Sequence, residues 1–164
     1  MTAAVRNATR RDAPRIAKLV TQLGYPVDAQ GAGARLRRWL DAPQSRLLLA
    51  ESDGVVSGLA AWHLLPHLEH DGWWARLAAL VVDDDWRGKG VGRLLVKTVE
   101  AEAAERGCTL IEVTSSRERT GAHAFYRMLG YRDRCAKSGR FLKPLRPRPD
   151  AVSPTSAKPG EYDQ

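Results

Sequence analysis

The sequence has few of the features that mark several common classes of protein. Only two cysteines occur in 164 residues, Cys108 and Cys135, and neither stands in a spacing typical of a zinc site or a disulfide framework. The longest apolar run covers residues 77–82, far short of the roughly 20 residues that a membrane-spanning helix needs. Arginines occupy the N-terminus where a secretory signal would have its apolar segment. We therefore predict unpaired thiols, no metal site, no membrane span and a cytoplasmic location.

The composition is that of a globular domain with an excess of positive charge. Hydrophobic residues make up 43% and charged residues 27% of the chain, as in ordinary folded proteins. The net charge of +7 suggests a nucleic acid, an anionic membrane or an anionic ligand as partner. No nucleic-acid-binding motif accompanies this charge. We therefore expect neither a nucleic acid nor a membrane as partner, and assign part of the charge to an anionic cofactor.

The last residues differ in composition from the rest of the chain. Five of the nine prolines follow Phe141, and residues 146–164 include few large apolar side chains. Such a segment buries too little surface to offset the entropy lost on ordering. Its charges cancel, so the excess of +7 belongs to residues 1–145. We predict one domain over residues 1–145 and a flexible proline-rich tail over residues 146–164.

Hydrophobic periodicity predicts an α/β (α+β) fold with a mixed, mostly antiparallel central sheet flanked by helices. A helix over residues 90–106 connects the expected strands 73–82 and 109–114, which makes them the only parallel pair. Ser52-Asp53-Gly54 predicts a hairpin turn. The other expected elements are helices over residues 12–23, 32–40 and 122–129, and strands over residues 5–8, 46–51, 55–63, 131–135 and 140–142.

A glycine-rich loop stands between the strand 73–82 and the helix that follows it. Glycines at alternate positions expose backbone amides, and the loop opens into a helix N-terminus, which favours an anion. The spacing fits neither the dinucleotide fingerprint nor the mononucleotide P-loop. Taken alone, the loop is either a phosphate site of another kind or a tight turn with incidental charges. Its glycines are Gly88, Gly90 and Gly92, and its basic residues are Arg87, Lys89 and Arg93.

Two motifs together resemble the GNAT superfamily of N-acetyltransferases, in its small bacterial-type form. The first is an Arg/Gln-x-x-Gly-x-Gly/Ala loop, present here from Arg87 to Gly92. The second is an aromatic-Tyr-x-x-x-Gly-Phe/Tyr segment, present here from Phe125 to Tyr131. The resemblance covers roughly residues 3 to 143. It implies a splayed pair of parallel strands that binds acetyl-CoA, with no metal.

The resemblance implies an enzyme that transfers acetyl from acetyl-CoA to a primary amine by direct attack in a ternary complex. Tyr126 matches the family tyrosine placed near the cofactor sulfur, and a phenol of pKa ~10 can protonate the leaving thiolate. Arg119 stands where many members have asparagine, and an arginine there would contact the cofactor phosphates instead. The implied cofactor-binding residues are Leu80, Val81, Val82, Arg87, Gly88, Lys89, Gly90, Val91, Gly92, Arg93, Arg119 and Tyr126.

The general base and the acceptor stay open at this stage. An alkylammonium of pKa ~10 must lose a proton before it attacks, and the family's usual strand glutamate has no equivalent within residues 73–82. We take Glu69 as the first candidate, with His70, Asp71, Glu112 or a water chain as alternatives.

We expect a small-molecule amine as acceptor, because the chain has no second recognition domain, with a protein or peptide amine as the alternative. A second class of function is an acyl-CoA-binding sensor without turnover, suggested by the missing strand carboxylate and by Arg119. The resemblance also makes a homodimer possible.

Overall fold

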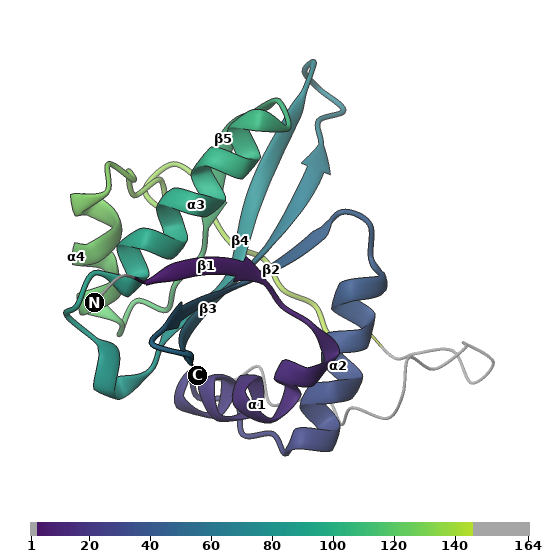
Figure 1. The fold of residues 1–164 in the computed structure, drawn as a ribbon. Coiled ribbons are helices and arrows are strands. Elements are labelled where there is room, and N and C mark those ends of the chain that lie inside the picture. Colours follow the sequence, from purple (N-terminus) through teal and green to yellow (C-terminus); the bar gives the residue numbers. More distant parts are fainter. Residues whose placement is uncertain (1–2, 146–164) are drawn as a thin grey trace. The chain divides into compact units, whose positions relative to one another are not determined.

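Five strands form one sheet in the order β1-β2-β3-β4-β5 in the computed structural model, which describes residues 3–145 (Figure 1). The first three neighbouring pairs are antiparallel, and β4 and β5 are parallel. This confirms the mostly antiparallel sheet and the parallel pair predicted from the helical crossover. The strands are β1 (Ala4–Asn7), β2 (Ser45–Ser52), β3 (Val55–Pro66), β4 (Trp73–Val82) and β5 (Cys108–Val113).

The helices are close to those predicted. They are α1 (Ala13–Gln22), α2 (Ala29–Asp41), α3 (Val91–Glu105) and α4 (Thr120–Met128), with short 3-10 turns η1 (Arg10–Asp12) and η2 (Asp84–Trp86). α2 begins before the predicted residue 32, because the Asp28 carboxylate accepts a hydrogen bond from the Gly31 amide at 2.7 Å and caps the helix. No helix within residues 3–145 is long and apolar enough to cross a membrane.

Residue contacts divide the chain into two parts, Met1–Thr120 and Gly121–Gln164, and each is described by itself. The predicted tail over residues 146–164 lies outside the described residues. In the second part, the strands predicted over residues 131–135 and 140–142 are wrong, since its described residues include no strand. Phe141 and Leu142 are 94% and 65% exposed. The residues between them and Tyr131 are mostly charged or small, so this stretch presents no apolar face to pack.

Helices cover both faces of the sheet in the first part (Figure 1). Ile16 and Leu19 of α1 and Leu36 of α2 pack against inward-facing side chains of β2, β3 and β4. α3 covers the opposite face and buries Leu95 completely. A Cβ atom on Gly58 of β3 would lie 3.1 Å from Leu95 and 2.9 Å from the Val81 carbonyl oxygen, so only glycine allows this close approach of helix and sheet.

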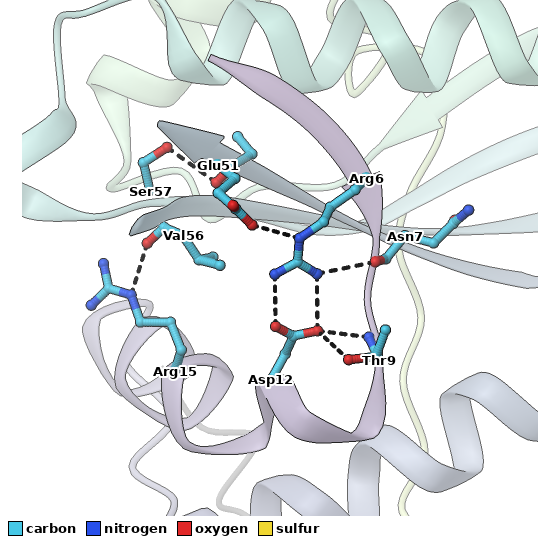
Figure 2. A network of polar contacts seen from close by, with 9 residues as sticks. Arg6, Asn7, Thr9, Asp12, Arg15, Glu51, Val56 and Ser57 are labelled. Atoms are coloured by element: carbon cyan, nitrogen blue, oxygen red, sulfur yellow. Dashed lines mark hydrogen bonds and ion pairs between the residues drawn. The ribbon is translucent and has the colours of Figure 1, made fainter. Parts of the chain in front are cut away.

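An arginine on β1 connects this strand to the turn before α1 (Figure 2). The Arg6 guanidinium donates two hydrogen bonds to Asp12, at 2.8 and 3.0 Å, and one to Glu51 at 2.6 Å. Asp12 also accepts from the Thr9 amide at 2.7 Å. These bonds, chiefly those from Arg6, lower the pKa of Asp12 to about 2. Asp12 is the residue before α1, and its side chain serves this network instead of capping the helix.

Candidate cofactor and acceptor site

The loop after β4 runs directly into the N-terminus of α3. Gly88 and Gly90 have positive φ angles of 73° and 85°, which glycine adopts without strain. A Cβ atom at either position would meet nothing within 4 Å, so backbone conformation selects glycine here, not space. Gly90 is the N-cap residue of α3 and supplies no side-chain cap. Amides of the first helical turn therefore lack a side-chain cap and favour an anion.

The basic residues of this loop make only exposed contacts. Arg87 forms an ion pair with Asp84 at 2.6 Å, and both side chains are largely exposed. The Lys89 ammonium lies 5.0 Å from the centroid of the Trp86 ring. Arg93 is exposed on the first turn of α3. Exposed contacts of this kind contribute about 0–1 kcal/mol, so a phosphate group can replace them.

A buried carboxylate, Asp83, attaches the start of the loop to α1. Asp83 is only 5% exposed. Its carboxylate accepts hydrogen bonds from Arg15 at 2.7 Å, from Gln22 at 3.3 Å and from the Asp85 amide at 3.1 Å. Gln22 also accepts a hydrogen bond from the amide of Asp84 at 3.3 Å. Arg15 and Gln22 of α1 therefore both hold the loop in place.

The same contacts extend to the start of β3. The Asp83 amide donates to the Ser57 carbonyl at 2.9 Å, and Arg15 donates through Nε to the Val56 carbonyl at 2.8 Å (Figure 2). Burial opposes the charge of Asp83, but the hydrogen bonds from the Asp85 amide and from Arg15 outweigh it and keep the pKa of this carboxyl below its usual range. Asp83 is therefore a charged group held at the junction of α1, β3 and the loop.

β4 and β5 separate before β4 ends. Their parallel pairing stops at Leu77 and Val113, while β4 continues to Val82 and pairs there only with β3. Among the described residues, positions 78–82 therefore have a neighbouring strand on one side only, and backbone groups on the other side need partners. We call this opening, between residues 78–82 of β4 and Val113, the fork.

Four polar side chains form a line across the sheet next to the fork. Ser45, His63, Arg76 and Glu112 occupy neighbouring register positions on β2, β3, β4 and β5 and therefore share one face. Ser45 Oγ lies 2.9 Å from His63 Nδ1, and Arg76 Nη1 lies 3.3 Å from Glu112 Oε1. The ring of Trp39 from α2 lies 4.5 Å from that of His63. We call Ser45, His63, Arg76 and Glu112 the polar row.

The polar row has one accessible charge of each sign. Burial, and secondly the charge of Arg76, lower the pKa of His63, so the imidazole is neutral at pH 7. The side chains of Arg76 and Glu112 are 35% and 40% exposed. The pair Arg76–Glu112 lies one register step from Leu77–Val113, the last pair before the fork. A guanidinium and a carboxylate are thus accessible at its inner corner.

The predicted bases lie at different distances from the fork. Glu69, His70 and Asp71 lie in the loop between β3 and β4, at the end of β4 opposite to the glycine loop. The ten residues of β4 at ~3.3 Å each place those two loops about 30 Å apart. The structure therefore brings Glu112 to the fork and leaves Glu69 at the far end of the strand. No group of three or more His, Cys, Asp or Glu residues within the described range is arranged to hold a metal.

The two other predicted site residues have identifiable surroundings. Arg119 donates a hydrogen bond to the Leu23 carbonyl at the end of α1, at 2.6 Å. Tyr126 lies on α4, with its ring 5.3 Å from that of Phe125 and 5.5 Å from that of Tyr131. Because Tyr126 belongs to the second part of the chain, its place beside the cofactor stays a prediction.

The sequence did not reveal the role of Asp83, nor that the four residues of the polar row lie side by side. Three consecutive aspartates follow β4, and none stands out by residue type. Because Val81 and Val82 are both apolar, alternation along the strand did not indicate which of the aspartates after it faces inward. The polar row had no local signal, because its members come from four strands.

Comparison with known proteins places the chain in a family. Residues 5–131 match the Acetyltransferase (GNAT) family, and the chain belongs to this family. The enzyme class predicted from the two motifs is confirmed: this is an N-acetyltransferase.

Two relatives cover most of the chain. It is 32% identical over 146 residues to the aminoalkylphosphonate N-acetyltransferase of Salmonella typhimurium, which spans 86% of this chain and 90% of that protein. It is 30% identical over 158 residues to the aminoglycoside N(6')-acetyltransferase type 1 of Stenotrophomonas maltophilia, with 87% and 94% covered.

A solved structure has the same fold. The putative acetyltransferase from Agrobacterium tumefaciens superimposes with a TM-score of 0.78 at 24% identity, covering 86% of this chain and 99% of that chain. The predicted fold class is therefore confirmed.

Proposed function

We propose that this enzyme transfers an acetyl group from acetyl-CoA to the primary amine of a small molecule, by direct attack while both are bound. The fork carries this proposal: a strand edge that needs partners continues into a glycine loop and a helix N-terminus with basic side chains. This combination fits a ligand with an amide-bearing arm and a diphosphate. When bound, acetyl-CoA supplies an acetyl group activated as a thioester.

Each predicted cofactor residue has a task in this proposal. The backbone of Leu80, Val81 and Val82 binds the pantetheine arm. The loop amides, with the positive charges beside them, bind the diphosphate. Arg119, whose side chain donates a hydrogen bond to the Leu23 carbonyl at the end of α1, contacts the cofactor phosphates in this proposal. The loop residues concerned are Arg87, Gly88, Lys89, Gly90, Val91, Gly92 and Arg93.

Glu112 accepts the amine proton, directly or through a water molecule. The acceptor enters as an ammonium and must lose a proton to become a nucleophile. Glu112 is the candidate carboxylate beside the fork, and it is accessible. Glu69, at the opposite end of β4, ranks behind it.

The test of the function is the release of free thiol from acetyl-CoA in the presence of different amines. The panel contains aminoalkylphosphonates, aminoglycosides, amino acids, polyamines and a peptide with a free N-terminus. Two relatives are named for small-molecule amines, so we expect the highest rates with small molecules. Binding of CoA without amine-dependent thiol release would support the sensor alternative. A peptide as the best acceptor would support the alternative of a protein amine.

Tyr126 is proposed as the acid that protonates the departing thiolate. We expect Tyr126→Phe to lower kcat by about 100-fold, the usual contribution of a positioned acid, with little change in the Kd of CoA. Steady-state kinetics and calorimetry measure the two quantities. Tyr25→Phe, at an exposed tyrosine, is the matched control. An unchanged kcat in Tyr126→Phe would remove this residue from the mechanism.

The cytoplasmic location, the homodimer and the absence of nucleic-acid and membrane partners stay predictions from the sequence.

A further inference from the structure

Arg76 presents a cation at the fork with most of its hydrogen-bonding capacity unused. Its Nη1 atom contacts Glu112 at 3.3 Å, and within residues 3–145 its Nε and Nη2 atoms have no hydrogen-bond partner. About a third of the side chain is exposed. A guanidinium with a free edge binds a carboxylate or phosphonate through two parallel hydrogen bonds. Arg76 can therefore bind an anionic group while it keeps its contact with Glu112.

The two charges of the polar row lie side by side. Arg76 and Glu112 are direct neighbours on β4 and β5, and Arg76 Nη1 lies 3.3 Å from Glu112 Oε1. An ammonium group on this carboxylate and an anionic group on the free edge of the guanidinium would therefore lie close together, as they do in a small molecule with a short aliphatic spacer. Glu112 directly precedes Val113, the last residue of β5 paired with β4 before the fork. Its carboxylate therefore lies next to the opening in which the proposed acetyl transfer takes place.

On the side of Arg76 away from Glu112, the polar row contains no carboxylate that would compete with a ligand for the guanidinium. The next two positions are His63 and Ser45, a neutral imidazole and a hydroxyl. Both are hydrogen-bonding groups without negative charge. An anion bound on this side of Arg76 therefore meets no repulsion from His63 or Ser45, and a cationic group bound there would find no carboxylate among these two neighbours.

We infer that the polar row selects acceptors in which a short spacer joins the primary amine to a carboxylate, phosphonate or phosphate group. Arg76 binds the anionic group, and Glu112 binds the ammonium and takes its proton. This inference rests on the proposed function and names the class of small amine that the enzyme acetylates. A polycationic amine offers nothing to Arg76 and brings further positive charge close to it.

The experiment compares amines that differ in the charge of their tail. 2-Aminoethylphosphonate and β-alanine carry an anionic group, propylamine does not, and an aminoglycoside is polycationic. Charged hydrogen bonds contribute about 1.5–3 kcal/mol, so we expect kcat/KM for the anionic amines to exceed that for propylamine by about 10- to 100-fold. Arg76→Gln should lower kcat/KM for the anionic amines by about 10- to 100-fold more than for propylamine, which abolishes this preference. Arg35→Gln, at an exposed position of α2, is the matched control and should preserve the preference.

Binding is measured independently of turnover. Calorimetric titration of 2-aminoethylphosphonate into the protein with CoA should give a Kd at least 10-fold weaker in Arg76→Gln than in the unmodified enzyme. If Arg76→Gln fails to fold, Arg76→Lys keeps the charge without the paired donors and should show a reduced preference.

The outcomes separate this inference from the proposed function. Absence of thiol release with every amine would refute the function itself. Acetylation of propylamine or the aminoglycoside as efficiently as of the anionic amines, by the unmodified enzyme, would overturn the inference and leave the function intact. The same holds if Arg76→Gln lowers kcat/KM equally for all amines.

Discussion

Arg15–Asp83 and Arg76–Glu112 are both arginine–carboxylate pairs that involve β4 or the residue after it, yet their surroundings differ. In the first pair the nitrogen and oxygen lie 2.7 Å apart and the Asp83 side chain is 6% exposed. In the second pair they lie 3.3 Å apart and the Glu112 side chain is 40% exposed. Asp83 accepts hydrogen bonds from three groups, whereas Glu112 accepts one from Arg76.

The difference separates a charge that maintains structure from a charge that remains available to a ligand. A buried carboxylate is destabilising when it loses a partner, so Asp83 holds the loop in one place. An exposed pair contributes only about 0–1 kcal/mol, so little stability depends on Arg76 and Glu112, and both remain accessible to an acceptor. A third pair, Arg6–Asp12, lies between these cases, with 11% of the Asp12 side chain exposed. The free energy of unfolding should therefore fall most when the most buried carboxylate is removed and least when the most exposed one is removed.

The largest effect on stability is expected for Asp83→Asn. The substitution leaves Arg15 without its charged partner in a mostly buried setting, and we expect a loss of about 3 kcal/mol in the free energy of unfolding. Because the loop loses its attachment to α1, the Kd of CoA should rise about 10-fold or more. Urea unfolding and calorimetry measure the two quantities.

Asp85→Asn provides the matched control for this change. Asp85 stands in the same loop with an exposed side chain, and its replacement should alter stability by less than about 0.5 kcal/mol. Equal costs for the two variants would show that burial of Asp83 does not fix the loop.

A smaller effect is expected for Asp12→Asn, and it should depend on pH. The pKa of Asp12 is about 2 in the folded protein against a usual 3.8, so its stabilisation is complete above about pH 4 and is lost as the pH falls towards 2. Because Arg6 is 38% exposed, screening reduces this contribution to about 1–2 kcal/mol. Urea unfolding of both proteins at pH 7 and pH 3 measures it.

The difference between the two proteins should be smaller at pH 3 than at pH 7. Asp41→Asn is the control, because the pair Arg10–Asp41 is largely exposed and its atoms lie 3.7 Å apart. A difference that is the same at both pH values would contradict the role of the charge.

The sequence predicted correctly those elements that depend on residues close together in the chain. Strand 73–82 was found with its correct bounds, because it is apolar on both faces and a loop rich in polar residues follows it. The hairpin at Asp53-Gly54 was found because both residues adopt the positive φ that such a turn requires. The glycine loop was predicted for the same reason, since Gly88 and Gly90 also adopt positive φ. Residues 131–142 alternate weakly and lack an apolar face, so propensity alone misplaced two strands there.

The parts of the site that depend on pairing between strands were not predictable in this way. Alternation along β5 places Glu112 on the opposite face from Ile111 and Val113, but it does not say which residues of the neighbouring strands stand beside Glu112. Arg76 and Glu112 come together only through the register of β4 with β5, and His63 joins them only through that of β3 with β4. Register is a property of the assembled sheet, so a list of candidate carboxylates could not rank Glu112 above Glu69.

The smallest effect on stability is expected for Glu112→Gln, at less than about 0.5 kcal/mol by urea unfolding, yet this variant should lose most of its activity. If Glu112 takes the amine proton, kcat should fall about 100-fold at pH 7 with the Kd of CoA unchanged. The deficit should shrink as pH rises towards the amine pKa of ~10, because more of the acceptor is already neutral.

A residue that serves only structure would not show this recovery, since raising the pH cannot replace a lost contact. Glu105→Gln, at the exposed end of α3, is the matched control and should follow the pH profile of the unmodified enzyme. A deficit that is constant at every pH would assign Glu112 to binding and return the proton transfer to Glu69 or to a water chain. Recovery in Glu112→Gln, together with the instability of Asp83→Asn, would show that the buried pair serves structure and that the exposed pair takes part in catalysis.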